Sequence, residues 1–247
     1  MWKILGVDVS WWQGVIDWIK LKSKAAFVFI RAGSVNSVTG EMYWDWALSV
    51  NGPAAENVKI EKGFYWFYRE FGKAHAIRQA EFFWGLVSEY TIERGLVIDV
   101  EVINFNPWNV LAFLDRLQEL SGLPDDKLGV YTRGWLWTSR GGGNVPPLKR
   151  FFLWIARYIN GLEGPWSDSE RYRAYPWDYA DYWQQSADGN NRGDEFGVES
   201  DDIDINLQRL ASVGGGDTPV DPQNPAEVPL GAVETMWAYG VGQGWWA

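Results

Sequence analysis

Short apolar runs alternate with amphipathic segments along much of the chain. Helical patterns follow five of the apolar runs, and apolar strands joined by crossover helices are typical of a parallel sheet. Eight such strands predict a closed α/β barrel of the TIM type. The strand candidates cover residues 2–9, 26–32, 62–69, 95–102, 127–134, 151–158, 178–186 and 201–208.

Helix starts support this alternation. Asp17 precedes a helical segment as a capping residue, and Asn106 followed by Pro107 predicts another helix start. Further helical patterns cover residues 42–56 and 74–90.

The composition changes after residue 210. We expect a barrel over residues 1–210 and a Gly/Pro-rich linker over 211–231. Residues 232–247 are too few for a domain, and their Trp residues favour a short tail docked on the barrel.

Charge and composition exclude several classes of protein. The net charge of −10 and the lack of a basic stripe argue against nucleic acid and acidic lipid as partners. No apolar run approaches the length of a membrane span, and the first residues do not resemble a signal peptide. With no cysteine and one histidine, thiolate sites and Ser-His-Asp chemistry are disfavoured. We expect His75 to be a surface or packing residue, and the protein to be a monomer.

Aromatic residues are unusually frequent, with 18 Trp, 11 Tyr and 12 Phe. Most single Trp residues fill core or surface. An excess of Trp is also typical of sugar-binding clefts, where flat rings stack on the apolar faces of pyranoses.

Acidic residues interrupt the apolar strands at one end. In "GLVIDVEV" (95–102), Asp99 and Glu101 are two residues apart and therefore point to the same face. Asp8 holds the matching position in the first strand, and Asp202 and Asp204 share a face in the last. A closed barrel makes the first and last strands neighbours, so we expect Asp8 beside Asp204, with Asp99 and Glu101 across the mouth.

Three interpretations fit such a cluster. The acids could be solvated strand ends, or oxygen ligands for Mg²⁺ or Ca²⁺. The run "ESDDIDIN" lacks the spacing of the calcium loop, however, and no phosphate-binding loop accompanies it. Glycosidic bond hydrolysis needs a protonated carboxylic acid and a carboxylate, which a crowded acidic mouth with aromatic walls supplies. We favour the third interpretation and expect no metal or cofactor.

Eight motifs in order resemble those of the glycoside hydrolase family 25 lysozymes, the Chalaropsis-type muramidases. They are "GVDVSWWQGVIDW", "FVFIRA", "GFYWFY", "VIDVEV", "GVYT", "LWIARY", "YWQQS" and "IDINL". The resemblance covers residues 4 to about 210. The related family 18 chitinases fit less well, because Arg94 and Val97 would stand where their signature has acids.

The resemblance implies a (β/α)5(β)3 barrel that cleaves the β-1,4 bond between N-acetylmuramic acid and N-acetylglucosamine. Glu101 would be the general acid/base. Asp99 would assist, by helping the substrate's 2-acetamido group act as nucleophile or in a direct attack by water. Asp8 and Asp204 would complete the acidic cluster.

The resemblance also implies an aromatic cleft formed by Tyr65, Phe67, Tyr131, Trp154, Tyr158 and Trp183. Two departures from the family pattern bear on substrate detail: Trp66 replaces the usual His, and residues 33–35 replace Thr-Glu-Gly. The lack of a signal peptide, together with the linker and tail, suggests an endolysin-like protein that acts on bacterial peptidoglycan. A glycan-binding barrel without catalysis and a hydrolase of another N-acetylhexosamine polymer are the alternatives.

Overall fold

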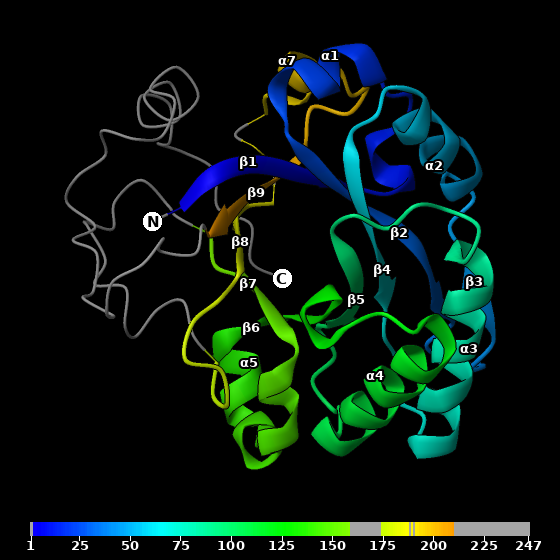
Figure 1. Ribbon diagram of the computed structural model, residues 1–247, viewed down its shortest axis with the longest axis vertical. Coiled ribbons are helices and arrows are strands. Elements are labelled where there is room, and N and C mark those ends of the chain that lie inside the picture. The colour runs from blue at the N-terminus through cyan, green and yellow to red at the C-terminus, as the bar shows by residue number, and fades with distance from the viewer. Residues whose placement is uncertain (1, 159–173, 188, 190, 210–247) are drawn as a thin grey trace.

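The computed structural model describes residues 2–158, 174–187, 189 and 191–209. Eight strands form a closed barrel, because the first strand pairs with the second as well as with the last (Figure 1). In barrel order the strands are β1 (Trp2–Val9), β2 (Phe27–Val35), β4 (Glu61–Phe67), β5 (Gly95–Val100), β6 (Leu128–Arg133), β7 (Phe152–Ala156), β8 (Tyr182–Ser186) and β9 (Asp204–Arg209).

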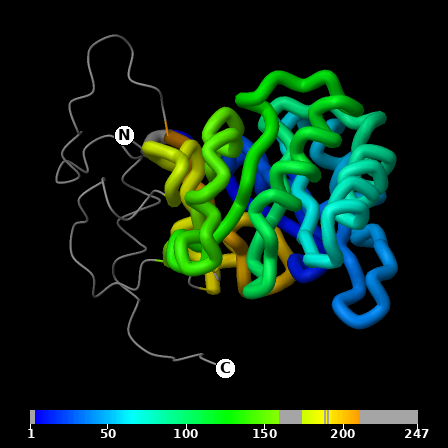
Figure 2. The backbone as a smooth tube through the Cα atoms, turned by 90° about the horizontal axis from the view of Figure 1, so that it is seen from below, coloured from blue at the N-terminus to red at the C-terminus, as the bar shows by residue number. Residues whose placement is uncertain are grey.

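Helices follow the first five barrel strands and cover the outside of the barrel (Figures 1 and 2). They are α1 (Trp18–Lys24), α2 (Leu48–Asn57), α3 (Lys73–Val87), α4 (Pro107–Ser121) and α5 (Gly134–Ser139). The short α7 (Gly193–Phe196) lies between β8 and β9. This order confirms the predicted (β/α)5(β)3 barrel. The predicted caps are also confirmed, since Asp17 accepts a hydrogen bond from the Lys20 amide and Asn106 from the Trp108 amide.

Short 3-10 helices occupy several connections. They are η1 (Trp11–Gln13), η2 (Asp125–Lys127), η3 (Gly142–Asn144) and η4 (Pro146–Arg150). The first of these follows β1 directly, and Ser10 caps it: its hydroxyl accepts from the Trp12 amide, while the Gln13 side chain accepts from the Ser10 amide. This capping box fixes the loop that carries Trp12 and Gln13 to the mouth of the barrel.

The last strand runs against the others. Strands β1 to β8 of the barrel pair in parallel, whereas β9 is antiparallel to both β8 and β1. The beginning of β9 therefore lies at the same end of the barrel as the carboxyl ends of the other strands. This reversal corrects the expectation of an all-parallel sheet, and it brings Asp204, the first residue of β9, to the mouth.

Side chains from the strands fill two cores. The interior of the barrel holds a small cluster rich in aromatic residues, and the larger core lies between the strands and the helices. Glycines admit the interior rings: a Cβ at Gly129 would stand 2.2 Å from the Phe152 ring, and one at Gly6 would stand 2.3 Å from the Phe27 ring. The interior cluster consists of Phe27, Phe29, Tyr65, Val97, Tyr131, Phe152, Trp154, Ala156 and Tyr182.

One predicted element is partly wrong. The helix expected over residues 42–56 begins only at Leu48, and Met42–Trp44 forms β3, an edge strand paired with the end of β2. The tight return after β2 places these residues beside a ready partner strand, so pairing overrides the helical pattern. The linker (211–231) and tail (232–247) lie outside the described residues. In the described part of the chain, no helix is both long and apolar enough to cross a membrane.

Candidate active site

A cavity of about 320 Å³ opens at the end of the barrel where β1 to β8 finish and β9 begins. We call it the central cavity. Its walls combine carboxylates with aromatic rings and a few amides and cations. The lining residues are Asp8, Ser10, Trp12, Gln13, Arg31, Tyr65, Phe67, Asp99, Glu101, Tyr131, Trp154, Tyr158, Gln184, Ala187, Ser200, Asp202 and Asp204.

Asp8 and Asp204 form one side of the acidic cluster. They stand opposite each other in the β1–β9 pair, and hydrogen bonding between their side chains lowers the pKa of Asp8. Asp8 Oδ2 also accepts from Gln184 Nε2 at 2.9 Å and from Asn206 Nδ2 at 2.8 Å. Burial raises the pKa of Asp8 to about 6, although these hydrogen bonds act in the opposite direction. The expected neighbourhood of Asp8 and Asp204 is confirmed.

Asp99 and Glu101 lie at the end of β5. Asp99 is buried, and its Oδ1 has no hydrogen-bond partner among the described residues. Burial, and then the charges of Glu101 and Asp8, raise the pKa of Asp99 well above its usual range, while Arg31 and Arg133 oppose the rise. Glu101 is the more accessible acid, and its Oε1 accepts from Arg133 Nε at 3.0 Å. Both side chains reach the central cavity, as their shared parity predicts.

Five of the six predicted cleft aromatics line the cavity, but they do so in different ways. Tyr65, Tyr131 and Trp154 form a nearly buried floor, whereas Tyr158 is exposed at the rim and Phe67 lies between. Trp154 is only 1% exposed and packs against the Phe29 and Tyr131 rings. The structure therefore places Trp154 below the surface that a sugar would contact.

Trp183 is not in the cleft, which corrects its predicted position. It points outward from β8 into the core behind the barrel, and its Nε1 donates to the Arg157 carbonyl oxygen at 2.8 Å. Neighbouring residues on a strand face opposite sides, so Gln184 reaches the cavity where Trp183 was expected.

Residues outside the predicted set organise the floor. Gln184 Oε1 accepts from the hydroxyl of Tyr131 at 2.6 Å, and Asn206 Oδ1 accepts from Trp154 Nε1 at 2.8 Å. Each amide thus connects an aromatic ring to Asp8. Asn206 shares the parity of Asp204 in "IDINL", a signal that the sequence contained.

Cations and an exposed ring complete the wall. Arg31 Nε is 2.7 Å from Asp45 Oδ2, so that this guanidinium is already paired, and Trp12 stacks on Trp11 with ring centroids 4.1 Å apart. Trp12 is 64% exposed and therefore has a free ring surface beside the acids.

Two other sequence features lie away from the cavity. Trp66, the departure from the family pattern, points outward to α3, and its Nε1 donates to Gln79 Oε1 at 2.8 Å. His75 packs on the same helix, bonded to the Gly40 carbonyl and the Gln79 side chain. His75 is thus a packing residue, as predicted, and the change at Trp66 leaves the cavity wall intact.

Comparison with known proteins agrees with this geometry. The curated relative Lysozyme M1 of Streptomyces globisporus is 28% identical over 224 residues, covering 85% of this chain and 71% of that protein. The spore cortex lytic enzyme SleM of Clostridium perfringens has a TM-score of 0.70 at 21% identity, over 85% of this chain and 68% of that one. A family 25 glycosyl hydrolase from Bacillus anthracis has a TM-score of 0.65 at 23% identity, over 85% of this chain and 91% of that one.

These two structures share the barrel fold. The family model of glycosyl hydrolases family 25 matches residues 7–194, a span that runs from the end of β1 through β8 and includes the acids Asp8, Asp99 and Glu101. The chain therefore belongs to glycosyl hydrolase family 25 and is a glycoside hydrolase of the lysozyme type.

Proposed function

We propose that the protein is an N-acetylmuramidase that cleaves the β-1,4 bond between N-acetylmuramic acid and N-acetylglucosamine in the peptidoglycan of the bacterial cell wall. One observation carries the proposal: β5 delivers two carboxyl groups of different character to one aromatic-walled cavity. Glu101 is partly exposed, whereas Asp99 is buried with an oxygen that has no partner among the described residues. Glycosidic hydrolysis with acetamido participation needs such a pair.

Glu101 is the proposed general acid/base. It stands at the edge of the cavity, where it can donate a proton to the glycosidic oxygen and later accept one from water. After the first transfer Glu101 is a carboxylate, and the Arg133 guanidinium at 3.0 Å is placed to stabilise it.

Asp99 is proposed to act on the substrate's own acetamido group. Its unpartnered Oδ1 can accept the acetamido N–H and so orient the carbonyl oxygen toward the anomeric carbon. Positive charge develops on the sugar in the transition state, which lowers the pKa of Asp99 at that moment. The burial that disfavours the ionised form at rest is thereby offset in the transition state.

Asp8 and Asp204 are proposed to support this pair. They stand opposite each other in the β1–β9 pair, and the amides of Gln184 and Asn206 hold Asp8 in one wall of the cavity. The exposed Trp12 and Tyr158 and the half-buried Phe67 offer ring surfaces for neighbouring sugars.

The test uses purified peptidoglycan. Wall digested with the protein is reduced with borohydride, and the reduced end sugar is identified by mass spectrometry. Reduced muramic acid is the expected product, whereas reduced glucosamine would contradict the proposal. If the protein binds the wall but releases no new reducing ends, the result would instead indicate a glycan-binding barrel without catalysis.

A further inference from the structure

A second cavity of about 470 Å³ adjoins the central cavity and shares Glu101 with it. We call it the side cavity. Its other walls come from the segments after β2, β4 and β5, with Val102 and the exposed Ile103 supplying apolar surface. The lining residues are Ser37, Arg69, Glu70, Phe71, Glu101, Val102, Ile103 and Asn104.

Arg69 is the cation of the side cavity. Its guanidinium carbon lies 4.7 Å from the centroid of the Phe67 ring, which itself lines the central cavity. The backbone is held on both sides of the residue, because the Arg69 carbonyl accepts from Gln79 Nε2 at 2.7 Å and the Arg69 amide donates to Gln79 Oε1. The Arg69 backbone is therefore held in place, and the guanidinium stacks on the Phe67 ring at the wall of the side cavity.

Arg69 has no carboxylate partner within the described part of the chain, and its buried Nε makes no hydrogen bond there. Other arginines of the mouth differ: Arg31 is paired with Asp45, and Arg133 with Glu101. A partly buried guanidinium without an anion is an unused binding group.

Both carboxylate oxygens of the nearby Glu70 already accept hydrogen bonds from other residues. Its Oε1 accepts from the Gly72 amide and from Asn109 Nδ2, and its Oε2 accepts from the Tyr68 hydroxyl and the Asn106 amide, at 2.8–2.9 Å. These four hydrogen bonds hold Glu70 in the wall and leave Arg69 available to a ligand.

The chemistry of the substrate supplies such an anion, if the proposed function holds. Muramic acid differs from glucosamine by a 3-O-lactyl group, which carries a methyl group and ends in a carboxylate or continues into the stem peptide with its own carboxylates. The central cavity is rich in acids and repels these anions. An unpaired guanidinium beside apolar Val102 and Ile103 matches a carboxylate next to a methyl group.

We propose that Arg69 binds the carboxylate carried on the lactyl arm of muramic acid, and that it is thereby a specificity-determining residue that favours muramic acid over glucosamine in the sugar next to the scissile bond. This inference rests on the proposed function, since it assigns a group of that substrate to the side cavity. Arg69 discriminates between substrates and takes no part in the proton transfers.

Calorimetric binding tests this assignment with wild-type protein. The probe is the disaccharide N-acetylglucosaminyl-N-acetylmuramic acid, which lacks the bond that a muramidase cleaves. Its lactyl methyl ester and its form with a stem dipeptide are measured beside it. Arg69→Gln is expected to weaken binding of a carboxylate form about ten- to a hundredfold and to leave the ester unchanged. A loss with the free disaccharide places the anion on the lactyl group, and a loss only with the dipeptide form places it on the peptide.

Two variants control for structure. Arg69→Lys keeps the charge and is expected to restore part of the affinity. Arg150→Gln removes a guanidinium stacked 4.3 Å from the Phe151 ring centroid before β7, at the other end of the barrel, and is expected to change nothing.

Unchanged affinity in Arg69→Gln, an equal loss for ester and acid, or no binding of either acid by the wild type would overturn the proposal. Because the assay reports binding, failure of the muramidase reaction is recognised separately by the end-sugar analysis.

Discussion

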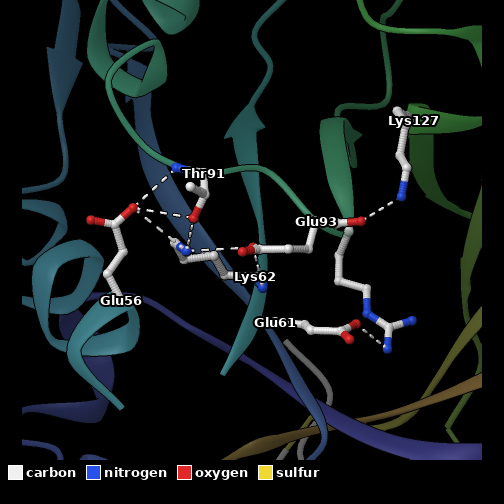
Figure 3. A network of polar contacts seen from close by, with 7 residues as sticks. Glu56, Glu61, Lys62, Thr91, Glu93 and Lys127 are labelled. Carbon is white, nitrogen blue, oxygen red and sulfur yellow. Dashed lines mark hydrogen bonds and ion pairs between the residues drawn. The ribbon is translucent and has the colours of Figure 1, made fainter. Parts of the chain in front are cut away.

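Both ends of the barrel hold buried charged groups, but the two ends differ in how completely these groups are paired. At the end where the parallel strands begin, Lys62 is 1% exposed. Its Nζ donates to Thr91 Oγ1 at 2.6 Å and to Glu93 Oε2 at 3.4 Å, and it lies 3.6 Å from Glu56 Oε1 (Figure 3). Nearby, Arg94 binds Glu61 and Gln208 through its terminal nitrogens. Charged groups at this end are therefore paired with one another, although Arg94 Nε makes no hydrogen bond to the described residues.

At the mouth, by contrast, pairing within the described residues is incomplete: Arg31 and Arg133 have carboxylate partners, but other charged groups do not. Asp99 Oδ1 and Arg69 Nε are buried and make no hydrogen bond within the described part of the chain, and burial raises the pKa values of Asp8 and Asp99. Groups in this state cost stability, and that cost is offset only when a ligand supplies the missing partner. Charges at the base of the barrel thus stabilise the fold, whereas the unpartnered groups at the mouth are available to the substrate.

The largest expected effect comes from Glu101. Glu101→Gln removes the proposed acid/base and should lower kcat/KM on peptidoglycan by about 10²–10⁴-fold. Circular dichroism and unfolding should remain close to wild type, because Glu101 is partly solvated. Glu93→Gln, the same change at the opposite end of the barrel, is the matched control and should keep full activity. If Glu101→Gln were as active as that control, the assignment of Glu101 as the general acid/base would be wrong.

The next effect is on stability at the mouth. The folded pKa of Asp8, about 6, lies above its unfolded value, so its contribution to stability is present below about pH 4 and is lost as the pH rises through 6. Asp8→Asn is always neutral and should raise the free energy of unfolding by about 3 kcal/mol at pH 8, but by almost nothing at pH 4.

Urea unfolding at the two pH values checks this prediction. A variant less stable than wild type at pH 8 would mean that the hydrogen bonds from Gln184 and Asn206 to the ionised carboxylate outweigh its burial.

The smallest expected effect is a loss of stability, whereas Asp8→Asn is expected to give a gain. Replacing both Glu56 and Glu93 by Gln leaves the Lys62 ammonium buried without a carboxylate and should cost about 2 kcal/mol, less than for a fully buried pair because both acids are partly solvated. Activity per folded molecule should not change.

This cost should depend on pH. Although burial opposes its ionisation, hydrogen bonds and the Lys62 charge lower the pKa of Glu93, so its contribution is present above the unfolded value and is lost as the pH falls. Thermal melts at pH 7 and pH 3.5 measure the difference. An equal deficit at both pH values would argue against an electrostatic origin.

Strand parity explains which parts of the site were predictable from sequence. Asp99 and Glu101, two apart in an apolar strand, had to share a face, and barrel closure had to bring Asp8 beside Asp204. Trp183 lies outside the cavity because it alternates along β8 with Gln184, whose side chain faces inward, so the position that the family resemblance implied was wrong.

Other features depend on tertiary structure alone. The reversal of β9 has no local sequence signal, because the pattern of apolar residues in a strand is the same whether the strand pairs parallel or antiparallel. The unpartnered state of Arg69 likewise depends on Glu70, which four donors from different segments occupy. A sequence pattern alone does not show that a charged side chain lacks an ion-pair partner in the folded protein.

Asp99→Asn tests the central claim most directly, by the urea unfolding midpoint and the muramidase activity of one preparation at pH 7.5. At that pH the unfolded chain ionises Asp99 freely, whereas its burial in the folded state raises the pKa. We predict that activity falls by at least about a hundredfold while the unfolding midpoint rises. A midpoint below that of wild type, or activity that survives the change, would contradict it.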